Sequence, residues 1–327
     1  MDRYTAIRRC VQADLERFER LFEETLSTRV PLADNVISYL LDRRGKQLRP
    51  LMTLLAARVA GGVPGEATLL GAVAMELVHN ASLIHDDVID RSDERRGAQT
   101  VNRVWDNRVA VLMGDFFLSK CLQCSNRTGS LAVSHILADM VARLTEGELE
   151  QLSNVRSHML SEEGYFSVIS GKTASLFGAC MRVGALTAGA EAGAVERLGR
   201  VGELMGLVFQ IRDDVFDYYP STAELGKPTG HDIAEGKVTL PLLYALQHAS
   251  PAEAQRMRAL LDHPRTIAPD VVARLVEFAK AVGGIDYAQA RMKRLAHEAH
   301  QGLETFADSE ARRALSDLID YFIERDH

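Results

Sequence analysis

The same acidic motif occurs twice in this chain, each time inside an apolar segment with helical spacing. The first copy is Asp86-Asp87-Val88-Ile89-Asp90 and the second is Asp213-Asp214-Val215-Phe216-Asp217. In a helix, the first and last aspartates of each copy lie four residues apart and share one face. Apolar residues precede both copies, which argues against open solvent around them. The chain is therefore expected to form two long helices that each end in an acidic cluster.

Clusters of this kind need a compensating positive charge. Two carboxylates about 4 Å apart repel each other by about 4 kcal/mol at an effective dielectric constant near 20. Six facing acids would oppose folding unless cations lay between them. Carboxylate oxygens suit Mg²⁺, which keeps several waters and often takes further ligands from substrate phosphates. The motifs predict a two-sided magnesium site for a phosphorylated substrate. The alternative is that each cluster is a solvated helix face.

Composition and spacing predict an all-α protein. Only 9 prolines are present among 327 residues, and apolar residues recur at intervals of three and four over most of the chain. No linker rich in Pro, Gly or Ser divides the sequence, so residues 1–327 are expected to form a single domain, a bundle of about a dozen helices. The net charge of −7 argues against nucleic acid as a partner.

Two of the predicted loops between helices have a distinctive composition. A basic segment at 43–50 and a polar, glycine-containing segment at 220–238 are the predicted loops. Helices are expected at 3–27, 32–43, 50–60, 66–91, 107–125, 129–155, 162–188 and 191–219, with shorter helices over 239–325.

Four cysteines do not indicate a disulfide framework or a zinc site. Cys121 and Cys124 form one C-x-x-C pair on a predicted helix, and no second pair completes a metal site, so we interpret them as reduced thiols. The N-terminal segment lacks the apolar stretch of a signal peptide, and no run of 18 apolar residues predicts a transmembrane helix. These features predict a cytoplasmic protein.

Basic side chains near the acidic motifs are candidates for binding the phosphates. Metal-bound diphosphate keeps a negative charge, and Lys and Arg are its usual partners. The candidates lie in predicted loops, in a Gly-Lys-Thr segment or within two helical turns of an acidic motif: Lys46, Arg49, His79, Arg95, Arg96, Lys172 with Thr173, Lys227 and Lys237. Each one alone could be an ordinary surface cation.

Together these motifs resemble those of the head-to-tail isoprenyl diphosphate synthases, also called the polyprenyl synthetase family. The matching stretches are Gly45–Pro50, Glu76–Gly97, Gly114-Asp115, Gly171–Ala174, Phe209–Asp217 and Gly226–Pro241. They cover roughly residues 40 to 245. One departure is Arg44, where the family often has a second glycine. The resemblance implies the all-α isoprenoid synthase fold around a central cavity, and a homodimer.

The resemblance also implies a reaction and a role for each motif. An allylic diphosphate would lose diphosphate to give a carbocation, which the alkene of isopentenyl diphosphate attacks. It implies three Mg²⁺ ions on Asp86, Asp87, Asp90, Asp213 and Asp217, with Asp214, Lys172 and Lys237 also in the catalytic set. The allylic diphosphate is expected on Arg95, Lys172, Thr173, Gln210, Lys227 and Lys237, and isopentenyl diphosphate on Lys46, Arg49, His79 and Arg96.

Product length is expected to depend on the helix before the first motif. Each helical turn rises about 5.4 Å, close to one isoprene unit. The residues below Asp86 on its face are Ser82, Ala81, Val78 and Met75. In this family a large aromatic at either of the first two positions gives short products, so the small Ala81 and Ser82 favour a C30 to C50 product. A C20 or C15 product, a class I terpene cyclase and a non-catalytic regulatory subunit are the alternatives.

Overall fold

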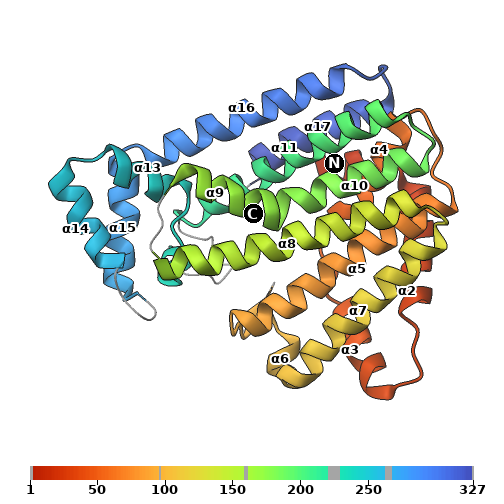
Figure 1. Cartoon of the computed structure of the whole chain (residues 1–327), viewed down its shortest axis with the longest axis horizontal. Helices are drawn as coiled ribbons and strands as arrows, with labels where there is room; N and C mark the ends of the chain where they lie inside the picture. The colour runs from red at the N-terminus through yellow and green to blue at the C-terminus, as the bar shows by residue number, and fades with distance from the viewer. Residues whose placement is uncertain (1–2, 96, 158–160, 220–228, 262–266, 326–327) are drawn as a thin grey trace. The chain divides into compact units, whose positions relative to one another are not determined.

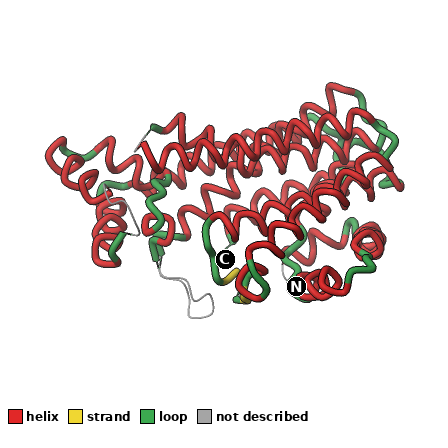
Figure 2. The backbone as a smooth tube through the Cα atoms, turned by 60° about the horizontal axis from the view of Figure 1, so that its bottom comes forward, coloured by secondary structure: helices red, strands yellow, loops and turns green. Residues whose placement is uncertain are grey.

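The computed structural model describes residues 3–95, 97–157, 161–219, 229–261 and 267–325. These residues are mostly helical, with short loops between the helices (Figures 1 and 2). Their strands are limited to a two-stranded antiparallel hairpin, β1 (Glu94–Arg95) with β2 (Ala98–Gln99). The predicted all-α fold class is therefore confirmed.

The chain forms two compact units, and each unit contains one acidic motif. Unit 1 comprises Met1–Val141, Leu176–Gly202 and Gly302–Leu318, and unit 2 comprises Ala142–Ser175, Glu203–Gln301 and Ile319–His327. Five helices contribute residues to both units: α8 (Leu131–Ser157), α10 (Ser175–Thr187), α11 (Ala192–Phe216), α16 (Gly284–Glu304) and α17 (Glu310–Glu324). A single domain over residues 1–327 stays a prediction.

Unit 1 is built around helix α5 (Glu66–Ile89), which packs against α2, α4, α6 and α7. The further helices that lie within this unit, or begin at its edge in the case of α10, are α1 (Arg3–Arg9), α2 (Gln12–Leu26), α3 (Pro31–Leu41), α4 (Leu48–Val59), α6 (Val101–Val104), α7 (Asn107–Arg127) and α10 (Ser175–Thr187). Among the described helices, α5 alone is long and apolar enough to pass a test for a membrane span, but 78% of that stretch is buried within the protein. This burial is typical of a core helix.

Close packing in unit 1 depends on a glycine. A Cβ atom added to Gly184 of α10 would lie only 2.1 Å from the carbonyl oxygen of Thr53 in α4. The two backbones can therefore approach only because the side chain is absent. This contact fixes α10 against the helix that follows the basic loop.

Unit 2 contains several short helices, most of α16, and the C-terminal parts of α8, α11 and α17. Its own elements are α9 (Glu162–Ile169), the π-helical segment η1 (Ser170–Ala174), α12 (His231–Ala234), α13 (Leu240–His248), α14 (Pro251–Leu261) and α15 (Pro269–Ala281). Helix α13 packs against α14 and α15. The Tyr244 ring of α13 also stacks on the Tyr287 ring of α16, with centroids 4.3 Å apart.

The predicted helices differ from the observed ones in three parts of the chain. The expected helix 3–27 breaks at a turn at Cys10 and Val11, which lets α1 bury Tyr4 and Ile7 separately from the apolar face of α2. The expected helix 162–188 is interrupted by η1. Shorter helices are expected over 239–325; α13, α15 and α17 have 9, 13 and 15 residues, whereas α16 has 21, as many as α7.

Candidate functional site

The first acidic motif lies at the C-terminal end of α5, in unit 1. Asp90 caps the helix and is exposed, Asp86 is half-buried, and Asp87 is only 5% exposed. Oδ1 of Asp87 accepts a 2.8 Å hydrogen bond from Nε of Arg95 in the following hairpin. Asp86 and Asp90 thus offer accessible carboxylates, whereas Asp87 joins the helix end to a predicted phosphate-binding arginine.

The residues predicted to hold isopentenyl diphosphate lie on three elements of unit 1. Lys46 is exposed in the loop before α4, and its carbonyl oxygen accepts hydrogen bonds from the Tyr4 hydroxyl and from Arg8. Arg49 is in the first turn of α4, with its guanidinium 5.1 Å from the Phe177 ring centroid. His79 is buried on α5. The predicted partner Arg96 lies outside the described residues.

The residues predicted to set product length follow one another down α5. Met75, Val78 and Ala81 are at most 3% exposed. The hydroxyl of Ser82, which is half-buried, donates a 2.9 Å hydrogen bond to the carbonyl oxygen of His79. These side chains are therefore small or apolar and face the interior of unit 1.

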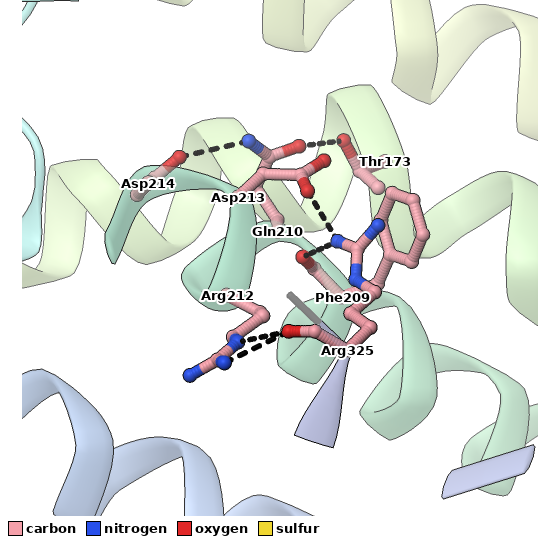
Figure 3. Close-up of polar contacts among 7 residues, drawn as sticks. All are labelled: Thr173, Phe209, Gln210, Arg212, Asp213, Asp214 and Arg325. Carbon is pink, nitrogen blue, oxygen red and sulfur yellow. Dashed lines mark hydrogen bonds and ion pairs between the residues drawn. The ribbon is translucent and has the colours of Figure 1, made fainter. Parts of the chain in front are cut away.

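The second acidic motif, in unit 2, is organised by a partly buried chain of hydrogen bonds (Figure 3). Oδ2 of Asp214 accepts a 2.6 Å bond from the Tyr165 hydroxyl, and Oδ1 accepts a 2.9 Å bond from Nε2 of Gln210. The Thr173 hydroxyl donates at 2.8 Å to the amide oxygen of Gln210. Burial, with the nearby charge of Asp232, raises the pKa of Asp214 to about 8. The structure thus brings together three predicted residues, Thr173, Gln210 and Asp214.

The other two aspartates of this motif have different environments. The Asp217 carboxylate accepts hydrogen bonds from the backbone N–H groups of His231 (2.8 Å) and Asp232 (3.0 Å), at the start of α12. Burial and the charge of Asp232 raise the pKa of Asp217. The side chain of Asp213 is 41% exposed, and its Oδ1 accepts a hydrogen bond from Arg325. Asp213 therefore presents the most accessible carboxylate of the second motif.

Two predicted lysines of unit 2 are each paired with a glutamate. Nζ of Lys172 lies 2.6 Å from Oε1 of Glu148 on α8, and Nζ of Lys237 lies 2.7 Å from Oε2 of Glu235. Gly147 permits the first pair, because a Cβ atom there would lie 2.7 Å from the backbone nitrogen of Lys172. The predicted Lys227 lies outside the described residues.

Several of the predicted site residues line a cavity of about 390 Å³ in unit 2. Its polar lining includes Lys172, Thr173, Gln210, Asp214, Asp232 and Lys237, and its apolar lining includes Val168, Ile169, Val238 and Leu243. This volume is in the range of small-molecule sites. A cavity lined by both lysines and aliphatic side chains suits a ligand with an anionic head and an apolar tail.

Sequence reasoning did not single out four residues that organise this site. Asp232 lies within the matching stretch Gly226–Pro241 and could have been found there as a carboxylate between two lysines. Tyr165, Glu148 and Arg325 gave no signal, since their roles depend on contacts with residues 49, 24 and 112 positions away.

A model of the polyprenyl synthetase family matches residues 30–279 of the chain. The chain belongs to the polyprenyl synthetase family. It is 36% identical to the octaprenyl diphosphate synthase of Haemophilus influenzae over 323 residues, which is 98% of this chain and 97% of that protein. The predicted family and the prenyltransferase class are confirmed by these matches.

Solved structures of the polyprenyl synthetase family share the fold. A polyprenyl synthase from Caulobacter crescentus CB15, complexed with calcium and isoprenyl diphosphate, is 35% identical with a TM-score of 0.90, over 99% of this chain and 98% of that one. A geranylgeranyl pyrophosphate synthase from Bacteroides thetaiotaomicron is 38% identical with a TM-score of 0.86, over 99% and 100% of the two chains. The chemistry of the family thus involves isoprenyl diphosphates and a divalent metal ion.

The residues of both motifs fit a divalent ion that also binds a substrate. Within the described ranges, no three His, Cys, Asp or Glu side chains form a ready-made metal cluster. Mg²⁺ usually takes only one or two protein carboxylates and completes its octahedral shell with water and substrate phosphates. Asp86, Asp90 and Asp213 supply accessible carboxylate oxygens of this kind.

Proposed function

We propose that this enzyme condenses an allylic diphosphate with isopentenyl diphosphate, head to tail and with Mg²⁺, to give a polyprenyl diphosphate of 30 to 50 carbons. The observation that carries this proposal is the cavity of unit 2, where Lys172, Lys237 and the Thr173–Gln210–Asp214 chain lie beside aliphatic side chains. The lysines match the negative charge of a diphosphate, and the aliphatic side chains match an apolar prenyl chain. The family of the chain supports the same reaction.

In this proposal the metal ligands come from both motifs: Asp86, Asp87, Asp90, Asp213 and Asp217, for three ions. When bound, Mg²⁺ would supply positive charge that stabilises the leaving diphosphate. To bind a metal ion, Asp87 would give up its hydrogen bond from Arg95. Asp217 would give up its hydrogen bonds from the backbone N–H groups of His231 and Asp232.

The basic side chains of this proposal hold the two substrates. Lys172, Lys237 and Arg95 exchange their carboxylate partners for phosphate oxygens of the allylic substrate, with Lys227 as a further cation. Lys46, Arg49, His79 and Arg96 hold isopentenyl diphosphate. Gln210 orients the allylic cation, and the Thr173 hydroxyl orients the phosphate. The carbocation formed on loss of diphosphate is attacked by the alkene, and a proton then leaves to the departed diphosphate.

The proposed product length rests on the small side chains of α5. Ala81 and Ser82 are small and lie about one turn before the first motif, and Val78 and Met75 lie about one and two turns further from it. The similarity to an octaprenyl diphosphate synthase supports a long product. The similarity to a geranylgeranyl pyrophosphate synthase favours the second candidate, a C20 product.

We also propose that the enzyme is a cytoplasmic homodimer. Three apolar side chains of α7 are exposed: Val111 by 42%, Leu112 by 67% and Leu122 by 60%. Their spacing of ten and eleven residues places Val111 and Leu112 on the same side of the helix as Leu122, about three turns away. A second copy of the chain could bury this side.

The decisive experiment incubates the purified protein with farnesyl diphosphate, isopentenyl diphosphate and Mg²⁺, and identifies the products by mass. Linear polyprenyl diphosphates of 30 to 50 carbons are expected. Cyclic hydrocarbons would indicate a terpene cyclase instead, and no condensation would contradict the proposal. Light scattering of the same sample would test the dimer.

Variants of the acidic motifs test the assigned residues. Asp86→Asn and Asp213→Asn should each lower turnover at least about 100-fold, because each removes a charge that supports the leaving group. Asp139→Asn is the matched control, since Asp139 is an exposed aspartate on α8. Equal turnover in all three variants would remove Asp86 and Asp213 from the site.

A further inference from the structure

The C-terminal end of α17 and the second acidic motif are joined by two arginines (Figure 3). Nη2 of Arg325 donates to Oδ1 of Asp213 and, at 3.1 Å, to the carbonyl oxygen of Phe209. In return, Nε and Nη2 of Arg212 donate to the carbonyl oxygen of Arg325, at 3.1 and 2.8 Å. Each arginine therefore binds the segment that carries the other one.

Aromatic packing holds Arg325 in place. Its guanidinium lies 3.9 Å from the Phe209 ring centroid, and its side chain is only 9% exposed. Phe322, one turn earlier on α17, is fully buried and meets the Phe209 ring edge-on at 5.2 Å. A planar guanidinium that is stacked and hydrogen-bonded on two sides loses most of its freedom before any ligand arrives. Arg325 is thus a fixed cation next to Asp213.

This contact restricts how Asp213 can bind a metal ion. With Oδ1 committed to Arg325, coordination through both carboxylate oxygens would require the ion pair to break. Ca²⁺ takes six to eight oxygen ligands and often binds a carboxylate through both oxygens, whereas Mg²⁺ requires an octahedral shell that holds few protein ligands and several waters. A carboxylate limited to one oxygen loses less as a ligand for Mg²⁺ than for Ca²⁺.

We propose that Arg325 is a positioning residue that keeps Asp213 a one-oxygen ligand and thereby favours Mg²⁺ over Ca²⁺ at the second acidic motif. The inference rests on the proposed function of Asp213 as a metal ligand. The positive charge of Arg325 weakens the binding of both ions, and by a similar factor since both are divalent. The ratio of the two affinities therefore reports on coordination, and the absolute affinities do not.

The test compares the full-length protein with Arg325→Met, which removes the donor and keeps a long side chain. The unfolding temperature is measured over increasing MgCl₂ or CaCl₂, with methylenediphosphonate as a non-reacting diphosphate probe, and gives a half-saturating concentration for each ion. Arg313→Met is the matched control, because Arg313 is also on α17 and pairs with an aspartate, Asp308, but is 62% exposed.

The wild-type protein and the control should prefer Mg²⁺. In Arg325→Met the ratio of the Ca²⁺ to the Mg²⁺ half-saturating concentration should fall about tenfold, since the loss of a residue that orients a metal ligand changes metal affinity by about 10- to 100-fold. If this variant does not fold, Arg325→Gln, which is too short to reach Asp213, should show the same fall.

Three results would separate the possible failures. An unchanged ratio in a folded Arg325 variant overturns the inference, as does a wild-type protein that binds both ions equally well. A wild-type protein that responds to neither ion argues instead against the metal site, and so against the proposed function.

Discussion

Tyr165 donates a 2.6 Å hydrogen bond to Oδ2 of Asp214, and both side chains are buried in unit 2. This bond ties α9 to the end of α11. Since Gln210 binds the other oxygen of Asp214 and also accepts from Thr173, the position of two cavity-lining side chains depends on one buried carboxyl group. Asp214 is therefore expected to act by fixing its neighbours.

The first prediction concerns Tyr165→Phe. Removing the hydroxyl leaves one oxygen of a buried carboxyl group without its partner, so the free energy of unfolding should fall by about 1 to 3 kcal/mol. Turnover should fall as well, because Gln210 and Thr173 lose a fixed neighbour. Denaturant unfolding and a steady-state assay measure the two effects. Tyr219→Phe is the control, since Tyr219 is 46% exposed; equal stability of the two variants would contradict the role of the bond.

The second prediction concerns the close approach of α8 and η1. A Cβ atom on Gly147 would lie 2.7 Å from the backbone nitrogen of Lys172, so Gly147→Ala must push the π-helical segment away. Overpacking of this kind costs about 1 to 3 kcal/mol of stability. The half-saturating concentration of the allylic substrate should rise, because Lys172 moves with its backbone.

A glycine with free space provides the control for Gly147→Ala. A Cβ atom on Gly193 of α11 would meet only the flexible end of Arg197, at 3.4 Å. Gly193→Ala should therefore stabilise the protein by up to about 1 kcal/mol through helix propensity. The prediction is wrong if both alanine variants shift the midpoint of thermal unfolding in the same direction.

Local patterns were sufficient to predict the fold class and the position of both acidic motifs at the ends of long helices. The acidic motifs fall at the ends of α5 and α11 because apolar spacing and helix-ending residues are encoded nearby in the sequence. The contacts of those residues were not predictable. Arg325 reaches Asp213 and Tyr165 reaches Asp214 only through tertiary packing, and the backbone of η1 approaches α8 closely at Gly147.

The third prediction concerns pH and the buried thiols of unit 1. All four cysteines are free, and burial raises the pKa of both Cys121 and Cys180 from 9.0 to about 12. Above pH 9 these thiols ionise in the unfolded chain while they stay protonated in the folded one. The unfolded state then binds fewer protons, so the free energy of unfolding should fall as the pH rises from 9 towards 12.

Urea unfolding at pH 8.5 and pH 10 measures this slope. Cys121→Ala with Cys180→Ala should flatten it relative to the wild-type protein. Iodoacetamide at pH 8.5 gives a second measurement, in which the half-buried Cys10 reacts first and Cys121 and Cys180 react only after unfolding. Rapid labelling of all four thiols in the folded protein would show that burial does not protect them.

The last prediction concerns product length and Ala81→Phe. Ala81 is fully buried on α5, one turn and a residue before Asp86. A phenyl ring there would fill the space that the growing prenyl chain is proposed to use, so products should shorten to about C15 or C20, as expected from a rise of about 5.4 Å per turn. Chromatography of the dephosphorylated products measures the change.

Overpacking will also cost about 1 to 3 kcal/mol of stability, so the assay is run well below the unfolding temperature. Val63→Phe, at a residue of unit 1 that is 77% exposed, should leave the product ladder unchanged. If Ala81→Phe is folded and gives the wild-type products, then the chain does not grow past Ala81, and the small side chains of α5 do not set its length.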